Sequence, residues 1–257
     1  MAIFAHPDDE SLAAGGVLAQ HAAAGSRTAV VTATWAPGTH RAEELAQALE
    51  ALGVGAPRLL GYADHQVPVS APGQPRLCDA PFDGAIGRVV AHLRAFRPDI
   101  VITHDPTGAS GHPDHVRTHH IVLLATHSAG IEELHPQAGP AWTPSSLWLS
   151  VYPAAGARAL GDLVATAGKR LRTVPDEMIT KAVDVRPWID RKQAAILAHR
   201  SEVARPRSLP ALLTGLPDSE RAHILGTEWF VCYDLAPGRV PGHRIQELPR
   251  PATERSA

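Results

Sequence analysis

The chain has 257 residues, 44% of them hydrophobic and 19% charged, with a formal net charge of −2. This length allows a large buried core, whereas the near-neutral charge excludes the basic surface typical of nucleic-acid-binding proteins. No apolar run reaches the roughly 18 residues of a membrane span, and a polar motif directly follows the first apolar residues, unlike in a secretory leader. We therefore expect a cytoplasmic protein with reduced cysteines at Cys78 and Cys232, no nucleic-acid partner and no membrane span.

Short apolar runs alternate with helical periodicities along the chain. This alternation predicts an α/β fold with a mostly parallel sheet and right-handed crossovers. The predicted strands are residues 2–5, 28–34, 58–62, 99–103, 146–152, 180–185 and 228–233, and the predicted helices are residues 8–24, 41–52, 82–96, 113–129, 155–171 and 187–200.

No linker or repeat divides the sequence, so we expect one domain over residues 1–257, with a loosely ordered tail at 237–257. The expected architecture is Rossmann-like, with strand order 3-2-1-4-5 and C-terminal additions. In that order the first and fourth strands are neighbours at the switch point, where ligands bind. The loop at 63–81 carries four prolines, and loops of this length are often functional.

The tripeptide His-Pro-Asp occurs twice, each time after a short apolar run and before a helical pattern. The first copy is His6-Pro7-Asp8, followed by Asp9, and the second is His112-Pro113-Asp114, followed by His115. Proline suits the first position of a helix because it lacks the N–H that would have no partner there. Both motifs are thus predicted at strand-to-helix corners, facing each other across one crevice.

Two imidazoles and one carboxylate, from His6, Asp9 and His115, form a candidate catalytic zinc site with an open position. Asp8 would lie beside that position and accept a proton from bound water. His112 would polarise a substrate oxygen or protonate a leaving group, and Asp114 would support one of the imidazoles. The simpler interpretation is that these carboxylates only stabilise the dipoles of two helices. The occurrence of two such motifs at neighbouring corners argues against it.

At these residues the chain resembles the zinc-dependent PIG-L/LmbE-like N-acetylglucosaminyl deacetylases, near their mycothiol branch. Besides the two motifs, similar segments are residues 41–54, 60–64 and 103–106, and Lys192, His199 and Ser201 match a weaker C-terminal signature. The resemblance is extensive over residues 1–125 and thin beyond them.

The resemblance implies zinc ligands His6, Asp9 and His115, a general base Asp8, and His112 as oxyanion donor or general acid. It also implies that Arg41 and Asp64 hold sugar hydroxyls. For Arg41 the alternative is a surface helix residue paired with Glu44. Fe²⁺ is an alternative to Zn²⁺, because the same ligand types suit both ions.

Two departures concern the substrate. Ser110 stands where the mycothiol enzymes carry a tyrosine, and the connection at residues 35–40 is short. Both predict an open site and a substrate bulkier than a simple inositol conjugate, with the 63–81 loop as a specificity element. The five residues before His6 also suggest a truncated start.

The expected function is hydrolysis of an N-acetyl or N-acyl group from an N-acetylglucosamine-containing small molecule. One alternative is an amidase of a larger thiol, lipid or glycopeptide conjugate, and another is a catalytically silent sugar-binding protein. A nucleotide-binding module is disfavoured, because no G-x-G-x-x-G follows the first strand. The sequence does not determine the oligomeric state, and a homo-oligomer is one of the alternatives.

Overall fold

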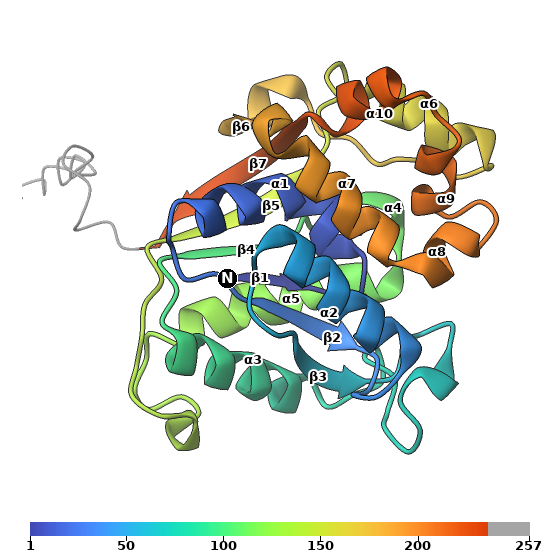
Figure 1. The fold of residues 1–257 in the computed structure, drawn as a ribbon. Coiled ribbons are helices and arrows are strands. Elements are labelled where there is room, and N and C mark those ends of the chain that lie inside the picture. The colour runs from blue at the N-terminus through green and yellow to red at the C-terminus, as the bar shows by residue number, and fades with distance from the viewer. Residues whose placement is uncertain (236–257) are drawn as a thin grey trace, which may run out of the picture.

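The computed structural model describes residues 1–235, so the predicted loose tail at 237–257 lies outside the described residues. A seven-stranded sheet in the order β3-β2-β1-β4-β5-β7-β6 forms the central layer (Figure 1). The predicted order 3-2-1-4-5 is confirmed, with the neighbouring strands of this part parallel, and β7 pairs antiparallel with both β5 and β6. The strands are β1 (Ala2–Phe4), β2 (Val30–Thr34), β3 (Arg58–Tyr62), β4 (Ile100–His104), β5 (Ser146–Val151), β6 (Lys181–Asp184) and β7 (Thr227–Asp234).

Helices cover both faces of this sheet. Helices α1, α2 and α7 pack on one face, and α3 and α5 pack on the other (Figure 1). Among residues 1–235, no helix combines the length and the apolar character of a membrane span. The helices are α1 (Asp9–Ala23), α2 (His40–Leu52), α3 (Phe82–Phe96), α4 (Gly108–Gly111), α5 (Pro113–Ser128), α6 (Arg158–Thr166), α7 (Ile189–Ala198), α8 (Arg200–Ala204), α9 (Leu209–Thr214) and α10 (Asp218–Leu225).

The strands divide their side chains between two hydrophobic cores. Ile3 of β1 and Val101 of β4 lie in the core beneath α3 and α5, whereas Phe4 and Ile102 lie in the core beneath α1, α2 and α7. Successive residues of a strand point to opposite faces, and a parallel sheet covered on both faces is apolar on both. This explains the continuous apolar runs of the sequence.

The C-terminal part holds elements that the sequence pattern did not predict. Helices α8, α9 and α10 fill residues 200–225, where no element was expected beyond the predicted helix at 187–200. They span only five to eight residues, which is too short for a clear helical period. They stand above the sheet edge at which β1 and β4 end (Figure 1).

Candidate active site

Two strand-to-helix corners meet at the switch point of the sheet. His6 follows β1 and Asp9 begins α1, while His112 precedes α5 and His115 lies in its first turn. Since β1 and β4 are adjacent, the two motifs come together as the sequence predicted. Within residues 1–235, three groups could hold a metal ion, namely His6-His112-His115, Asp9-His104-His115 and His6-Asp64-Asp114.

The three predicted ligands lie close together, although they do not form one of these three groups, and their closest approaches involve both oxygens of Asp9. His6 Nδ1 is 3.0 Å from His115 Nε2 and 3.5 Å from Asp9 Oδ2, and His115 Nε2 is 3.4 Å from Asp9 Oδ1. Zinc–ligand bonds of about 2.0–2.1 Å in a tetrahedron place ligand atoms about 3.4 Å apart. The separations lie near this value, so the three side chains are close enough to approach one ion.

Carboxylates hold the other nitrogen of His6. His6 Nε2 lies 3.2 Å from Asp114 Oδ2 and 3.2 Å from Asp64 Oδ2. A proton on Nε2 can be donated to these carboxylates, and Nδ1 on the other side of the ring faces His115 Nε2. Carboxylate–histidine pairs of this kind orient metal-ligating imidazoles.

A backbone carbonyl fixes the ring of His115 in the same way. Its Nδ1 lies 3.0 Å from the carbonyl oxygen of Gly108, so this nitrogen donates and Nε2 stays free. Gly108 has a φ of 62°, and a Cβ there would lie 2.6 Å from the Cβ of His115. Only glycine therefore allows the loop to approach so closely.

His104, at the end of β4, is a site residue that the sequence analysis missed. Its ring stacks on His115 with centroids 4.1 Å apart, and its Nε2 lies 3.4 Å from Asp9 Oδ2. The same Nε2 accepts a hydrogen bond from the backbone N–H of Ala5, which engages its lone pair. Its position at a strand end beside Asp105 was the available signal.

Burial and neighbouring charges shift the pKa values of this cluster. Burial opposes the charge on Asp9, but His115 and His104 bring the pKa of Asp9 well below its usual value. Burial also lowers the pKa of His115 well below 6.5. An ionised carboxylate and a neutral imidazole are the forms that bind metal ions. For His6, burial is outweighed by Asp114, Asp64 and Asp9, which raise its pKa.

Asp8 occupies a strained position between the cluster and Arg41. Its φ is 125°, a conformation that non-glycine residues keep only when their surroundings hold it. Asp8 Oδ1 lies 3.3 Å from Arg41, while Glu202 of α8 lies 3.1 Å from the other end of that guanidinium. Burial raises the pKa of Asp8 to about 7, against the opposing effect of Arg41.

His112 caps α5 and presents one nitrogen to the cavity. Its Nδ1 accepts a hydrogen bond from the N–H of Asp114 at 3.2 Å, which places the ring proton on Nε2. Burial lowers the pKa of His112. A neutral ring with an Nε2–H group is a hydrogen-bond donor, so this geometry favours the oxyanion role over the general-acid role.

Arg41 and Asp64 are both buried and both line the cavity. The surface alternative for Arg41 is wrong, because it also donates to the carbonyl of Pro7 and Glu44 pairs instead with Ser201. Asp64 faces His6 with one oxygen and accepts the N–H groups of Gln66 and Val67 with the other. It thus ties the 63–81 loop to His6.

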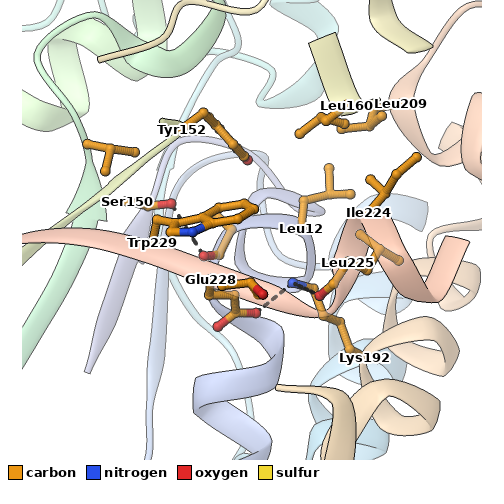
Figure 2. Close-up of a pocket in the computed structure, with 13 residues that line it drawn as sticks. Leu12, Ser150, Tyr152, Leu160, Lys192, Leu209, Ile224, Leu225, Glu228 and Trp229 are labelled. Atoms are coloured by element: carbon orange, nitrogen blue, oxygen red, sulfur yellow. Dashed lines mark hydrogen bonds and ion pairs between the residues drawn. The ribbon is translucent and has the colours of Figure 1, made fainter. Parts of the chain in front are cut away.

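The three residues of the weaker C-terminal signature each meet a glutamate of another element. Lys192 contacts Glu228 of β7 at 2.7 Å, and His199 and Ser201 contact Glu10 and Glu44. Figure 2 shows Lys192 pointing at the Glu228 carboxylate beneath Trp229.

The Glu228 carboxylate also accepts N–H groups from the middle of α1. Its two oxygens bond the N–H groups of Gly16 and Val17, at 2.7 and 2.9 Å. A Cβ on Gly16 would lie 2.3 Å from Val185, so this glycine serves close packing rather than nucleotide binding. These pairs connect the C-terminal segment to the helix that carries Asp9.

A cavity of about 810 Å³ opens above these residues. Ser110 and the loop residues Gln66 and Val67 contribute to its lining, as do Lys169 and Arg170 after α6. The last two were not singled out by the sequence analysis, because a short basic run outside a known motif does not by itself indicate a site. Pockets of this size hold small molecules.

The chain is similar in sequence to known deacetylases. The PIG-L family model, described as GlcNAc-PI de-N-acetylase, matches residues 1–126. The 1D-myo-inositol 2-acetamido-2-deoxy-alpha-D-glucopyranoside deacetylase of Rhodococcus opacus is 36% identical over 236 residues, covering 78% of this chain and 80% of that protein.

Solved structures share the fold at lower identity. The N,N'-diacetylchitobiose deacetylase of Pyrococcus horikoshii is 20% identical, with a TM-score of 0.63 over 93% of this chain and 85% of that one. The 4-carboxy-2-hydroxymuconate hydratase of a Pseudomonas strain, KT2440, is 19% identical, with a TM-score of 0.58 over 100% and 98%. The fold thus also occurs in a hydratase, so function must be argued from the site. By its sequence similarity, the chain belongs to the PIG-L family of de-N-acetylases.

Proposed function

We propose that this protein is a metal-dependent N-deacetylase that hydrolyses the acetamide of an N-acetylglucosamine conjugate. His6 Nδ1, an oxygen of Asp9 and His115 Nε2 would hold the ion. The observation that carries the proposal is that His6 Nδ1 and His115 Nε2 face each other at 3.0 Å, while the opposite nitrogens of the two rings are held by Asp114 and Gly108. Without an ion, a proton on His6 Nδ1 can bridge to His115 Nε2, and a bound cation would take the place of that proton.

Zn²⁺ suits this donor set of two imidazoles and one carboxylate, and Fe²⁺ uses the same set. We propose Zn²⁺ as the ion, because three protein ligands with one open position are typical of catalytic zinc sites. When bound, such an ion polarises a carbonyl and lowers the pKa of water.

Asp8 is the proposed general base. Its carboxylate lies beside the proposed ligands and faces Arg41. Because it is not itself a ligand in this proposal, it can accept a proton from the attacking water. The same proton is then available to the leaving amine, which balances the reaction to a free amine and acetate. Arg41 and Glu202 keep the Asp8 side chain oriented during this exchange.

His112 is the proposed oxyanion donor. Its Nε2–H points away from the capping bond at Nδ1, and it can donate to the carbonyl oxygen as negative charge develops. Such donors stabilise the transition state more than the substrate.

A larger amide is a second candidate substrate. The cavity of about 810 Å³ exceeds what one N-acetylhexosamine fills, and Ser110 places no phenol at its own position, although Tyr152 also lines the cavity. This favours a conjugate over the free sugar, and it keeps an amidase of larger acyl groups as the alternative.

An amine-release assay tests the proposal. Zinc-loaded protein is incubated with N-acetylglucosamine, its inositol conjugate and longer N-acyl glycosides, and primary amine is measured. Asp8→Asn should keep its metal and lose about 10²-fold or more in turnover, whereas Asp83→Asn, at an exposed carboxylate of α3, should match the wild type. Absence of amine release from every substrate would indicate a catalytically silent binding protein. Loss of metal in Asp8→Asn would show that Asp8 is the ligand and Asp9 the base.

A further inference from the structure

Basic side chains gather at one side of the cavity mouth. Lys169 and Arg170 follow α6, Arg205 follows α8, and all three line the cavity. The guanidinium of Arg172 packs over Gly111, another lining residue. Arg207 bonds the carbonyl of Ala167 beside them. We call Lys169, Arg170, Arg172, Arg205 and Arg207 the basic rim.

The protein neutralises little of this charge. Within residues 1–235, only Arg205 of the basic rim has a carboxylate at ion-pair distance, and this carboxylate, Glu202, also serves Arg41. Lys169 and Arg170 have no carboxylate within ion-pair distance among the described residues. The pKa of Lys169 is lowered by burial and then by Arg205 and Arg207, as expected where cations crowd together. An anion placed here would relieve this repulsion.

The basic rim lies near the reacting centre. Lys169 is within electrostatic reach of Asp8 and Glu202, and Lys169, Arg170 and Arg205 line the same cavity as Asp8. A substrate with its amide at Asp8 could therefore extend its remaining part toward the basic rim.

We propose that the basic rim binds an anionic group, a phosphate or a carboxylate, on the part of the substrate attached to the amino sugar. Arginine forks and a lysine ammonium are the side chains that bind such groups. The inference rests on the proposed function, because it places the anion relative to a reacting acetamide. The inositol conjugate for which one relative is named carries no charge, so the inference predicts a different kind of substrate for this chain.

Three substrates that share N-acetylglucosamine test the inference. They are the methyl glycoside, which is neutral, the 1-phosphate, and the glycoside of glycolic acid, which carries a carboxylate. We expect KM to be about tenfold lower for at least one anionic substrate at low ionic strength, with kcat nearly unchanged, because the contact lies away from the reacting bond. Added salt should reduce the difference in KM between neutral and anionic substrates. Comparing the two anionic substrates shows whether the basic rim prefers a phosphate or a carboxylate.

Matched variants assign the effect to the basic rim. Lys169→Ala/Arg170→Ala should abolish the preference for the anion and leave the neutral substrate within about twofold. Arg158→Ala/Lys181→Ala removes the same charge from residues outside the cavity lining and should keep the preference. Equal KM values for neutral and anionic substrates, or a preference that survives in the first variant, would overturn the inference.

Calorimetry with the deacetylated amines gives a readout that needs no turnover. Glucosamine 1-phosphate or the glycolate glycoside should bind the wild type about tenfold more tightly than methyl glucosaminide, and the Lys169→Ala/Arg170→Ala variant should bind them equally. If no substrate releases amine, the proposed function fails, and these affinities alone decide whether the basic rim binds anions. Equal affinities in the wild type would refute it.

Discussion

His199 Nε2 lies 2.8 Å from Glu10 Oε1, although the two residues are 189 positions apart in the chain. Both side chains are fully buried. The other carboxylate oxygen of Glu10 accepts the backbone N–H of Asp8 at 3.0 Å, and Asp8 has the strained φ of 125°. The C-terminal helices therefore help to hold the proposed base in its conformation.

Breaking this pair should harm both stability and turnover. His199→Ala leaves the Glu10 carboxylate buried without its partner, which costs about 3–5 kcal/mol, and it lets Asp8 relax. We expect a lower midpoint of urea unfolding and a lower kcat, with metal content nearly unchanged because His6 and His115 keep their own supports. His120→Ala, at an exposed histidine of α5, is the control. A folded His199→Ala with normal kcat would show that Asp8 needs no such support.

The same pair should make stability depend on pH. Despite burial, Glu10 raises the pKa of His199 above 6.5, and His199 lowers the pKa of Glu10 below 4.5. The contribution of His199 is complete below pH 6.5 and is lost as pH rises through its raised pKa. That of Glu10 is present above pH 4.5 and is lost as pH falls through its lowered pKa.

The free energy of unfolding of the wild type should therefore exceed that of His199→Ala most between pH 4.5 and 6.5. Urea unfolding of the two chelator-treated proteins across pH measures this difference. A difference that keeps growing above pH 6.5 would contradict the assignment of charge to His199.

Metal affinity should separate ligands from their supports. His115→Ala should lose most of the bound metal in elemental analysis, because it removes one of three proposed ligands. Asp114→Asn, which removes the charge behind His6 Nε2 from a carboxylate that also contacts His65 and Cys78, should weaken affinity about 10- to 100-fold, measured by competition with a chelator. Asp83→Asn serves again as the control. Full metal retention in His115→Ala would remove this residue from the ligand set.

Substrate size remains a separate prediction. Ser110 and the short 35–40 connection leave the cavity open, and Gln66 and Val67 of the 63–81 loop line it. We expect kcat/KM to be higher for large N-acyl glycosides than for free N-acetylglucosamine. A clear preference for the monosaccharide would show that the loop refills the space, while leaving the metal chemistry intact.

Much of the site could be predicted from short segments of the sequence. Each His-Pro-Asp motif combines an apolar run, a proline suited to a helix start and acidic residues suited to its first turn. These signals depend on residues a few positions apart, so they identified both corners. The alternation of strands and helices then predicted that the two corners are neighbours. The adjacency of β1 and β4 agrees with this prediction.

Other features depend on contacts that no local pattern encodes. The pairing of Glu10 with His199, the Glu202 contact of Arg41 and the position of Asp64 against His6 join segments far apart in the chain. The strand β7 was predicted, but its antiparallel pairing depends on packing. The helices α8 to α10 were not predicted, since they are too short to show a helical period. The sequence alone thus determined which groups do the proposed chemistry. Tertiary packing decided how each is oriented, because orientation depends on buried partners that only the folded chain brings within hydrogen-bond distance.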